Sequence, residues 1–194
     1  APKVSLRSEF ACLTGMRFPD FINSGEYAEL WNEARINDGL APTYTGEEIL
    51  KYYTGSDPYN YPDIDWMDHI FKKNTFQTVH NLNINGGTEK VRYFVNLGYT
   101  MQDGLFMRDP SFEYNTNVNM YRYNLRANVD IQLAPSLVAE VGLGYISTDQ
   151  THPGYYTPEI LGAAFDYAPN KIPMRNPDGT FSASIFNQYT NPYM

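Results

Sequence analysis

The side chains that most often bind metals or form covalent intermediates are few and scattered in this sequence. The three histidines, His69, His80 and His152, do not have the spacing of HExxH or of another metal motif. Cys12 is the single cysteine, so neither an intrachain disulfide nor a CxxC pair is available. It belongs to no motif, and we expect it on the apolar face of a strand. The sequence therefore predicts no metal site and no cofactor.

The carboxylates do not indicate catalysis either. Asp63, Asp65 and Asp68 surround Trp66, but the glycine and the distal glutamate of a calcium loop are missing. We interpret these three as a solvated or helix-capping cluster. Glycoside hydrolysis needs a defined pair of carboxylates, and nothing singles out a pair among the 22 acidic residues. We predict that the chain is not an enzyme.

Aromatic side chains are the more promising candidates for binding. They make up 15% of the chain, with 17 Tyr, 11 Phe and 2 Trp. Rings in exposed loops present an apolar body with a polar tip, which suits stacking on the faces of sugars. The alternative is packing within folded loops or against a partner protein. The candidates for substrate or partner contact are Trp31, Trp66, Tyr155 and Tyr156, together with the pair Tyr52 and Tyr53.

Length and charge limit the class of protein that carries these residues. A chain of 194 residues is expected to form one domain, or two. The net charge of −8 argues against nucleic-acid binding, which needs a basic face. The sequence contains no run of 18 apolar residues, so no transmembrane helix is predicted. The first ten residues lack the apolar region of a signal peptide. Only 19% of residues are charged, and the polarity comes from Asn, Thr, Tyr and Gly, which favours Tyr-rich strands with long ordered loops.

The clearest structural pattern is alternation with a period of two over residues 121–133. The odd positions are apolar or aromatic from Tyr121 to Leu133, and the even positions are polar from Arg122 to Gln132. Such alternation predicts a strand with one apolar face and one wet face. Similar alternation predicts further strands at residues 4–12, 76–85, 91–101 and 137–146, although His80 interrupts the apolar face of the second of these.

The connections between these strands alternate between long and short. Tight turns are expected at Gly86-Gly87-Thr88 and at Ala134-Pro135-Ser136. The other connections, 13–75, 103–120 and 147–194, are long, so all the long loops lie at one end of the sheet. This asymmetry, the strand lengths and the tyrosines near the ends of the apolar faces are typical of an outer-membrane β-barrel. A soluble β-sandwich shows the same periodicity and stays open as an alternative.

Short helices are expected inside the long loops. We predict helices at 24–34, with Ser24 as the N-cap, from residue 45, at 65–71 and at 158–167. Residues 170–194 contain three prolines and are expected to be loop with one short strand.

Three charged residues on the polar face of 121–133 are candidates to face a barrel lumen. Arg122, Arg126 and Asp130 project from the same side of the predicted strand. There they would line a polar path or contact a plug inside the barrel. The alternative is a ladder of ion pairs across neighbouring strands.

Six stretches of this chain resemble the SusC/RagA family of TonB-dependent outer-membrane transporters. The most specific are NLNINGGTEKVRYFVNLGYTMQDGLF and RYNLRANVDIQL. The terminal Asn191-Pro192-Tyr193 also resembles a family position. The stretches, in order, are 2–10, 17–34, 61–73, 81–106, 122–133 and 176–181.

The resemblance implies an all-β fold, with this chain forming about five strands of a much larger antiparallel transmembrane barrel. The barrel that the resemblance implies has 22 strands and holds an N-terminal plug inside. The resemblance implies that residues 1–194 are the N-terminal part of the barrel domain, without the plug, and that 13–75, 103–120 and 147–194 are extracellular loops. Five strands cannot close a barrel, so we expect the chain to be a piece of a longer protein.

The resemblance also implies a function. It indicates location in the cell outer membrane and energised import of glycans or peptides. The implied partners are a SusD-like lipoprotein on the surface, TonB in the periplasm, and membrane lipid. The alternative from another class is a soluble β-rich carbohydrate-binding module. The two differ in whether the apolar faces of 91–101 and 121–133 meet lipid or pack against each other as a closed core.

Overall fold

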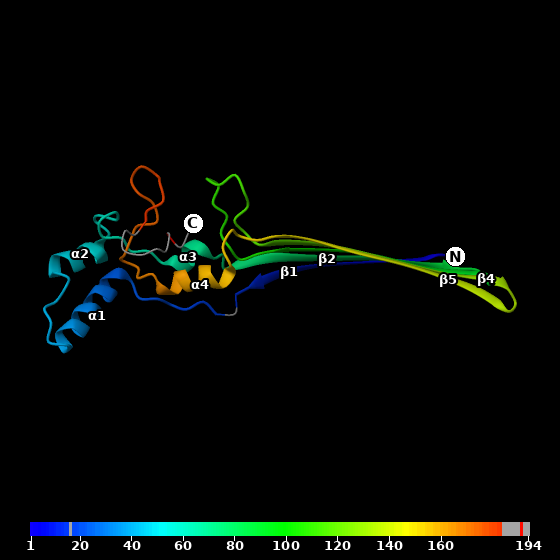
Figure 1. Cartoon of the computed structure of the whole chain (residues 1–194), viewed down its shortest axis with the longest axis horizontal. Helices are drawn as coiled ribbons and strands as arrows, with labels where there is room; N and C mark the ends of the chain where they lie inside the picture. Colours follow the sequence, from blue (N-terminus) through cyan, green and yellow to red (C-terminus); the bar gives the residue numbers. More distant parts are fainter. Residues whose placement is uncertain (16, 184–190, 192–194) are drawn as a thin grey trace. The chain divides into compact units, whose positions relative to one another are not determined.

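A computed structural model describes residues 1–15, 17–183 and 191. The chain divides into two compact units. Residues 1–15 and 73–154 form a sheet unit, and residues 16–72 and 155–194 form a helical unit (Figure 1). Among the described residues, no helix is long and apolar enough to span a membrane.

The sheet unit is one antiparallel sheet whose strands follow each other in chain order. It confirms all five predicted strands, and each of them is longer than the alternating pattern indicates. β1 and β5 are the two edges of the sheet, so the sheet does not close on itself. The strands are β1 (Lys3–Thr14), β2 (Asn74–Gly87), β3 (Val91–Asp103), β4 (Asn119–Ala134) and β5 (Leu137–Thr151).

The strand register places the apolar positions of all five strands on one face. Leu97 of β3 pairs with Leu82 of β2 and with Leu125 of β4. Leu82 pairs with Leu6 of β1, and Leu125 pairs with Tyr145 of β5. The polar positions lie on the opposite face, because neighbouring residues of a strand point to opposite sides.

The two short turns lie at one end of the sheet. Pro135 and Ser136 connect β4 to β5, as predicted. The predicted turn at Gly86-Gly87-Thr88 is wrong by two residues, because both glycines belong to β2 and the turn is formed by residues 88–90. The Thr88 hydroxyl accepts hydrogen bonds from the backbone amides of Lys90 and Val91, at 3.3 and 3.2 Å.

Gly87 is required by close approach of the backbone. A Cβ atom at this position would collide with the carbonyl oxygen of Val91 and lie 2.8 Å from the Cα of Arg92. Both atoms belong to the main chain of β3 and cannot rotate away. The glycine therefore permits the hairpin through its lack of a side chain.

Four helices are found among the described residues of the helical unit, and all four were predicted within a few residues. They are α1 (Ser24–Asn37), α2 (Gly46–Thr54), α3 (Trp66–Ile70) and α4 (Thr157–Asp166) (Figure 1). Thr45 caps α2 and Asp65 caps α3 through side-chain hydrogen bonds to backbone amides.

The predicted N-cap of α1 is wrong. Asn23, and not Ser24, accepts from the amide of Glu26 at 2.9 Å, and the Glu26 carboxylate accepts from the amide of Asn23. This reciprocal pair is a capping box. Ser24 is fully buried, and its hydroxyl donates instead to the carbonyl of Pro62 at 2.8 Å. The serine joins two segments of the chain, which a local helix signal does not reveal.

Aromatic and amide side chains hold the helical unit together. Tyr52 packs edge-to-face against Tyr44 and Tyr61. Asn32 of α1 accepts from the amides of Thr43 and Tyr44 and so fixes the loop before α2. Within residues 170–183, the expected short strand is reduced to one bridge between Arg175 and Phe181. Pro192 and Tyr193 lie outside the described residues.

We expect Gly87→Ala to destabilise the folded protein by about 1–3 kcal/mol, because the new Cβ overlaps main-chain atoms. The measurement is the urea midpoint of the full-length protein refolded in detergent. Gly144→Ala is the matched control, since a Cβ at Gly144 meets no described atom within 4 Å. Equal midpoints for the two variants would contradict the steric role of Gly87.

Candidate functional site

The apolar face of the sheet is uncovered: its residues are exposed on the edge strands β1 and β5 and mostly half-buried on the three strands between them. Leu6 is 70% exposed, Val141 60% and Tyr145 58%. Ten residue steps separate Val91 from Met101 on this face of β3, which corresponds to about 34 Å along a strand. A tilt of about 40° reduces this to about 26 Å, close to the apolar band of an outer-membrane barrel.

A row of rings crosses the apolar face toward the long-loop end of the sheet. His80 stacks on Tyr99 with centroids 6.0 Å apart, and Tyr99 packs on Tyr123 at 5.3 Å. Phe10 meets His80 edge-on, and Nδ1 of His80 lies 3.0 Å from the Ser8 hydroxyl. His80 therefore continues an aromatic row, which explains why it stands at an apolar position. Aromatic rows toward one end of the apolar face are typical of the girdles at membrane interfaces.

The opposite face carries the three predicted lumen residues, and the register brings them onto one side. Asp130 pairs with Arg92 of β3 and Glu140 of β5. Arg126 pairs with Asn96 and Gly144, and Arg122 pairs with Thr100 and Thr148. That this face lines a lumen stays a prediction.

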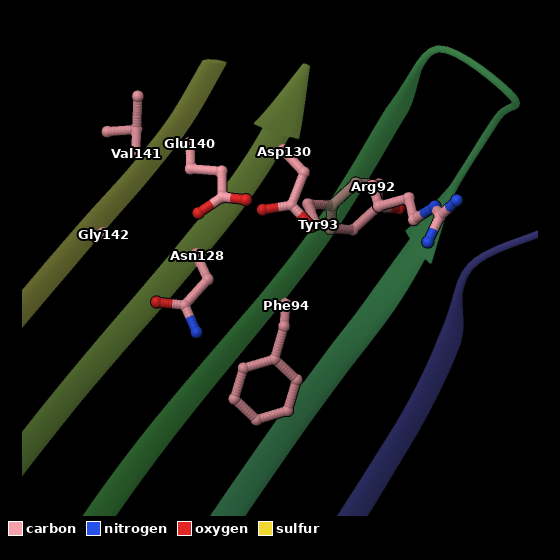
Figure 2. Close-up of a pocket in the computed structure, with 8 residues that line it drawn as sticks. All are labelled: Arg92, Tyr93, Phe94, Asn128, Asp130, Glu140, Val141 and Gly142. Atoms are coloured by element: carbon pink, nitrogen blue, oxygen red, sulfur yellow. The ribbon is translucent and has the colours of Figure 1, made fainter. Parts of the chain in front are cut away.

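A hollow of about 540 Å³ lies on the polar face near the short turns. Figure 2 shows the Asp130 and Glu140 carboxylates pointing toward each other, while the Arg92 side chain extends away from Asp130. Asn128 and Phe94 continue the lining, and Gly142 leaves space beside them. The sequence pattern placed Arg92 and Glu140 on polar strand faces, but only the register shows that they flank Asp130.

The charged residues of this face do not form a ladder of ion pairs. Within the described part of the chain, Arg122, Arg126 and Asp130 take part in no ion pair. The cross-strand ladder considered from the sequence is therefore not present. These charges are free to meet groups outside this sheet.

Amide side chains occupy much of the remaining polar face. Asn96 donates to Asn83 at 2.8 Å. Asn81 and Asn124 flank Gly98, where a Cβ would lie 3.2–3.3 Å from their side chains. The side chains of Asn81 and Asn124 form no hydrogen bond among the described residues. The middle of this face therefore offers amide donors and acceptors to an external polar group.

The predicted aromatic contact residues lie in different environments. Trp31 of α1 is 45% exposed, stacks on Tyr27 and donates from Nε1 to the Thr43 hydroxyl at 3.2 Å. Tyr155 and Tyr156 precede α4 and are 57% and 72% exposed. No ring contact among described residues joins Trp31 to these two tyrosines or to Trp66.

The prediction that Trp66 and Tyr52 are exposed is wrong. Trp66 is 3% exposed and meets Tyr167 edge-on at 5.8 Å. Tyr52 is also buried, in contact with Tyr44 and Tyr61. Burial raises the pKa of Tyr52, and the neighbouring Tyr44 adds to the shift. Both rings belong to the core of the helical unit, because only the tertiary fold reveals which loop aromatics pack inward.

The sequence of this chain is similar to those of TonB-dependent receptors. No family model matches the chain. It is 27% identical over 196 residues to TonB-dependent receptor P26 of Formosa agariphila. This match covers 98% of the present chain and 17% of the receptor. It is 26% identical over 140 residues to TonB-dependent receptor SusC of Bacteroides thetaiotaomicron, covering 66% of this chain and 14% of SusC. The chain thus spans less than a fifth of these relatives.

The structure of the RagAB peptide transporter matches the whole chain. The TM-score is 0.64 at 14% identity, and the match covers 24% of that transporter chain. The chain is SusC/RagA-like: it is similar to TonB-dependent receptors in sequence and to the RagAB transporter in fold. The SusC/RagA-like chain therefore has the fold of part of a large antiparallel outer-membrane barrel, as predicted.

The relatives also separate the classes of function considered from the sequence. They are named as receptors and as a transporter, in agreement with the prediction that the chain is not an enzyme. The exposed apolar face of the SusC/RagA-like chain does not support the soluble carbohydrate-binding module, which would need a closed core.

We expect Leu125→Arg to destabilise the full-length protein by about 2–4 kcal/mol, because it places a charge near the middle of the apolar band. Asn124→Arg is the control, since it adds the same side chain one residue earlier on the polar face. The measurement is the guanidinium midpoint in lipid vesicles. A larger loss for Asn124→Arg would reverse the assignment of the two faces.

Proposed function

We propose that this chain forms part of the wall of an outer-membrane, TonB-dependent importer of nutrients. One observation carries the proposal: an apolar face of bilayer height stays exposed on a sheet whose other face is polar. Water disfavours such a face, whereas lipid accepts it without cost. The likeness to TonB-dependent receptors supports the same conclusion.

The direction of the strands supports a topology for the importer. The three long connections all begin or end at the same end of the sheet, opposite the turns at 88–90 and 135–136. In outer-membrane barrels the short turns are periplasmic and the long loops extracellular. We assign 1–194 to the barrel domain, and 13–75, 103–120 and 147–194 to its extracellular side. The helical unit belongs to the first and last of these loops.

The polar face supplies contacts inside the barrel. Arg122, Arg126 and Asp130 have no ion-pair partner among the described residues and are available to a plug or to passing cargo. The Asp130–Glu140 pair makes the turn end of this face acidic. An acidic surface beside unpaired arginines suits a partner with charges of both signs, as a folded plug domain has.

Glycans are the cargo that we propose, with peptides as the second possibility. Trp31, Tyr155 and Tyr156 expose large rings in the helical unit and are the candidates for contact with sugar or with a lid. The proposed partners are a SusD-like surface lipoprotein, which would close over the extracellular loops, and TonB, which would supply energy. The importer performs no covalent chemistry in this proposal.

The first test concerns the natural full-length protein. We expect a polypeptide several times longer than 194 residues, in the outer-membrane fraction, that co-purifies with a lipoprotein in mild detergent. Deleting its gene should abolish growth on particular polysaccharides as sole carbon source. A soluble protein of about 22 kDa that is monodisperse without detergent would refute the importer.

The second test addresses the exposed rings. The triple variant with Trp31, Tyr155 and Tyr156 changed to Ala should reduce uptake at least tenfold, at an unchanged level of barrel in the membrane. Tyr59→Ala is the control, since Tyr59 is similarly exposed in the same unit and is not a candidate. Normal uptake by the triple variant would exclude these rings from cargo or lid contact.

A further inference from the structure

The first and last long loops, 13–75 and 147–194, share one folded core. Trp66 of α3 comes from the first loop and is 3% exposed. Tyr167 and Ala164 come from the last loop and are 6% and 3% exposed. All three belong to the helical unit, although β2 to β5 lie between the two loops in the sequence. The core of this unit therefore depends on residues from both loops.

Aromatic contacts join the two loops at two places. Trp66 meets Tyr167 edge-on, with ring centroids 5.8 Å apart. Phe21 of the first loop meets Phe165 of the last loop edge-on at 5.6 Å. Phe21 and Phe165 also line a cavity of about 480 Å³, whose other walls again come from both loops. Separating the loops would bring the Trp66 and Tyr167 rings into water, which disfavours exposed apolar surface.

Hydrogen bonds also connect the two loops. The backbone amide of Ile64 donates to the carbonyl of Pro169 at 3.1 Å. The side-chain amide of Asn170 donates to the Tyr44 hydroxyl at 2.9 Å. Because Pro169 and Asn170 are neighbours, one short segment of the last loop holds two separate parts of the first. Hydrogen bonds are directional, so they fix how the loops are oriented, which apolar packing alone does not.

The two parts of the first loop that meet the last loop are also tied to α1. The backbone amide of Ser24 donates to Asp63, and the Ser24 hydroxyl donates to the carbonyl of Pro62, both at 2.8 Å. The Asn32 side chain accepts from the backbone amide of Tyr44 at 2.9 Å. The contacts therefore extend from the last loop through the first loop to α1.

The third long loop, 103–120, belongs to the sheet unit. Segments that move in function are drawn from regions with few buried apolar contacts. The first and last loops are joined instead by buried rings and by directional hydrogen bonds. These contacts argue against separation of the two loops.

We propose that the first and last long loops move as one body during import, and that cargo does not pass between them. The proposal rests on the import function proposed above. The coupling between the loops is measured without transport, so a failure of the import function and a failure of the coupling give different results.

Hydrogen exchange of the full-length protein in detergent tests the shared core. Tyr167→Ala changes only the last loop but removes the ring that Trp66 contacts. We expect amide exchange in residues 64–71 of the first loop to become about tenfold faster, because both loops open together. Tyr155→Ala is the matched control, since Tyr155 is in the same loop and is 57% exposed. It should leave exchange in residues 64–71 unchanged.

A cross-link tests the movement during import. Phe21→Cys and Phe165→Cys are combined in a background in which Cys12 and any further cysteine are replaced by serine. Phe21 and Phe165 are 42% and 51% exposed, so a short bismaleimide can reach both positions. We expect the cross-link to form, as read by mass spectrometry, with no loss of polysaccharide uptake relative to the two single variants treated with the same reagent.

Three outcomes would overturn the proposal. Faster exchange confined to the last loop in Tyr167→Ala would show that the loops fold separately. Failure of the cross-link to form would show that the loops are apart in the membrane. A loss of uptake confined to the cross-linked double variant would show that the loops must separate for cargo to pass. The cross-link result stands even where Tyr167→Ala does not accumulate.

Discussion

The strand register of the sheet is the constraint on which the rest of the sheet unit depends. Because side chains alternate along a strand, a slip of one residue would move every apolar side chain to the polar face. The pairing of Leu97 with Leu82 and Leu125 keeps β2, β3 and β4 in phase, and Leu6 and Tyr145 extend it to β1 and β5. The hairpins at residues 88–90 and 135–136 maintain this register. The first requires glycine at position 87, because a side chain there would overlap the main chain of β3.

This register produces two surfaces with opposite requirements. One face presents Leu, Val and Tyr outward and is stable only against lipid or another apolar layer. The other collects unpaired charges and amides, including Asp130, which lies between Arg92 and Glu140. A sheet with open edges at β1 and β5 leaves backbone groups that further strands must pair. The same physical demands are met by the large barrels that the chain resembles.

The helical unit is organised by different interactions. Capping boxes start α1 and α2, and buried contacts such as Ser24 to Pro62 connect segments far apart in sequence. This unit exposes the rings of Trp31, Tyr155 and Tyr156, whereas the sheet presents one apolar and one polar face.

The sequence alone determined the strands, the helices and the separation of apolar from polar faces, because these follow from local periodicity and capping signals. It also determined that Arg122, Arg126 and Asp130 share a face, since they are an even number of residues apart. Tertiary structure decided which residues flank them, because register depends on pairing between strands. It also decided that Trp66 is buried while Trp31 is exposed, and that Asp63 and the end of α4 line the same cavity. Burial and cavities arise from contacts between distant segments, and no local pattern in one strand or helix records them.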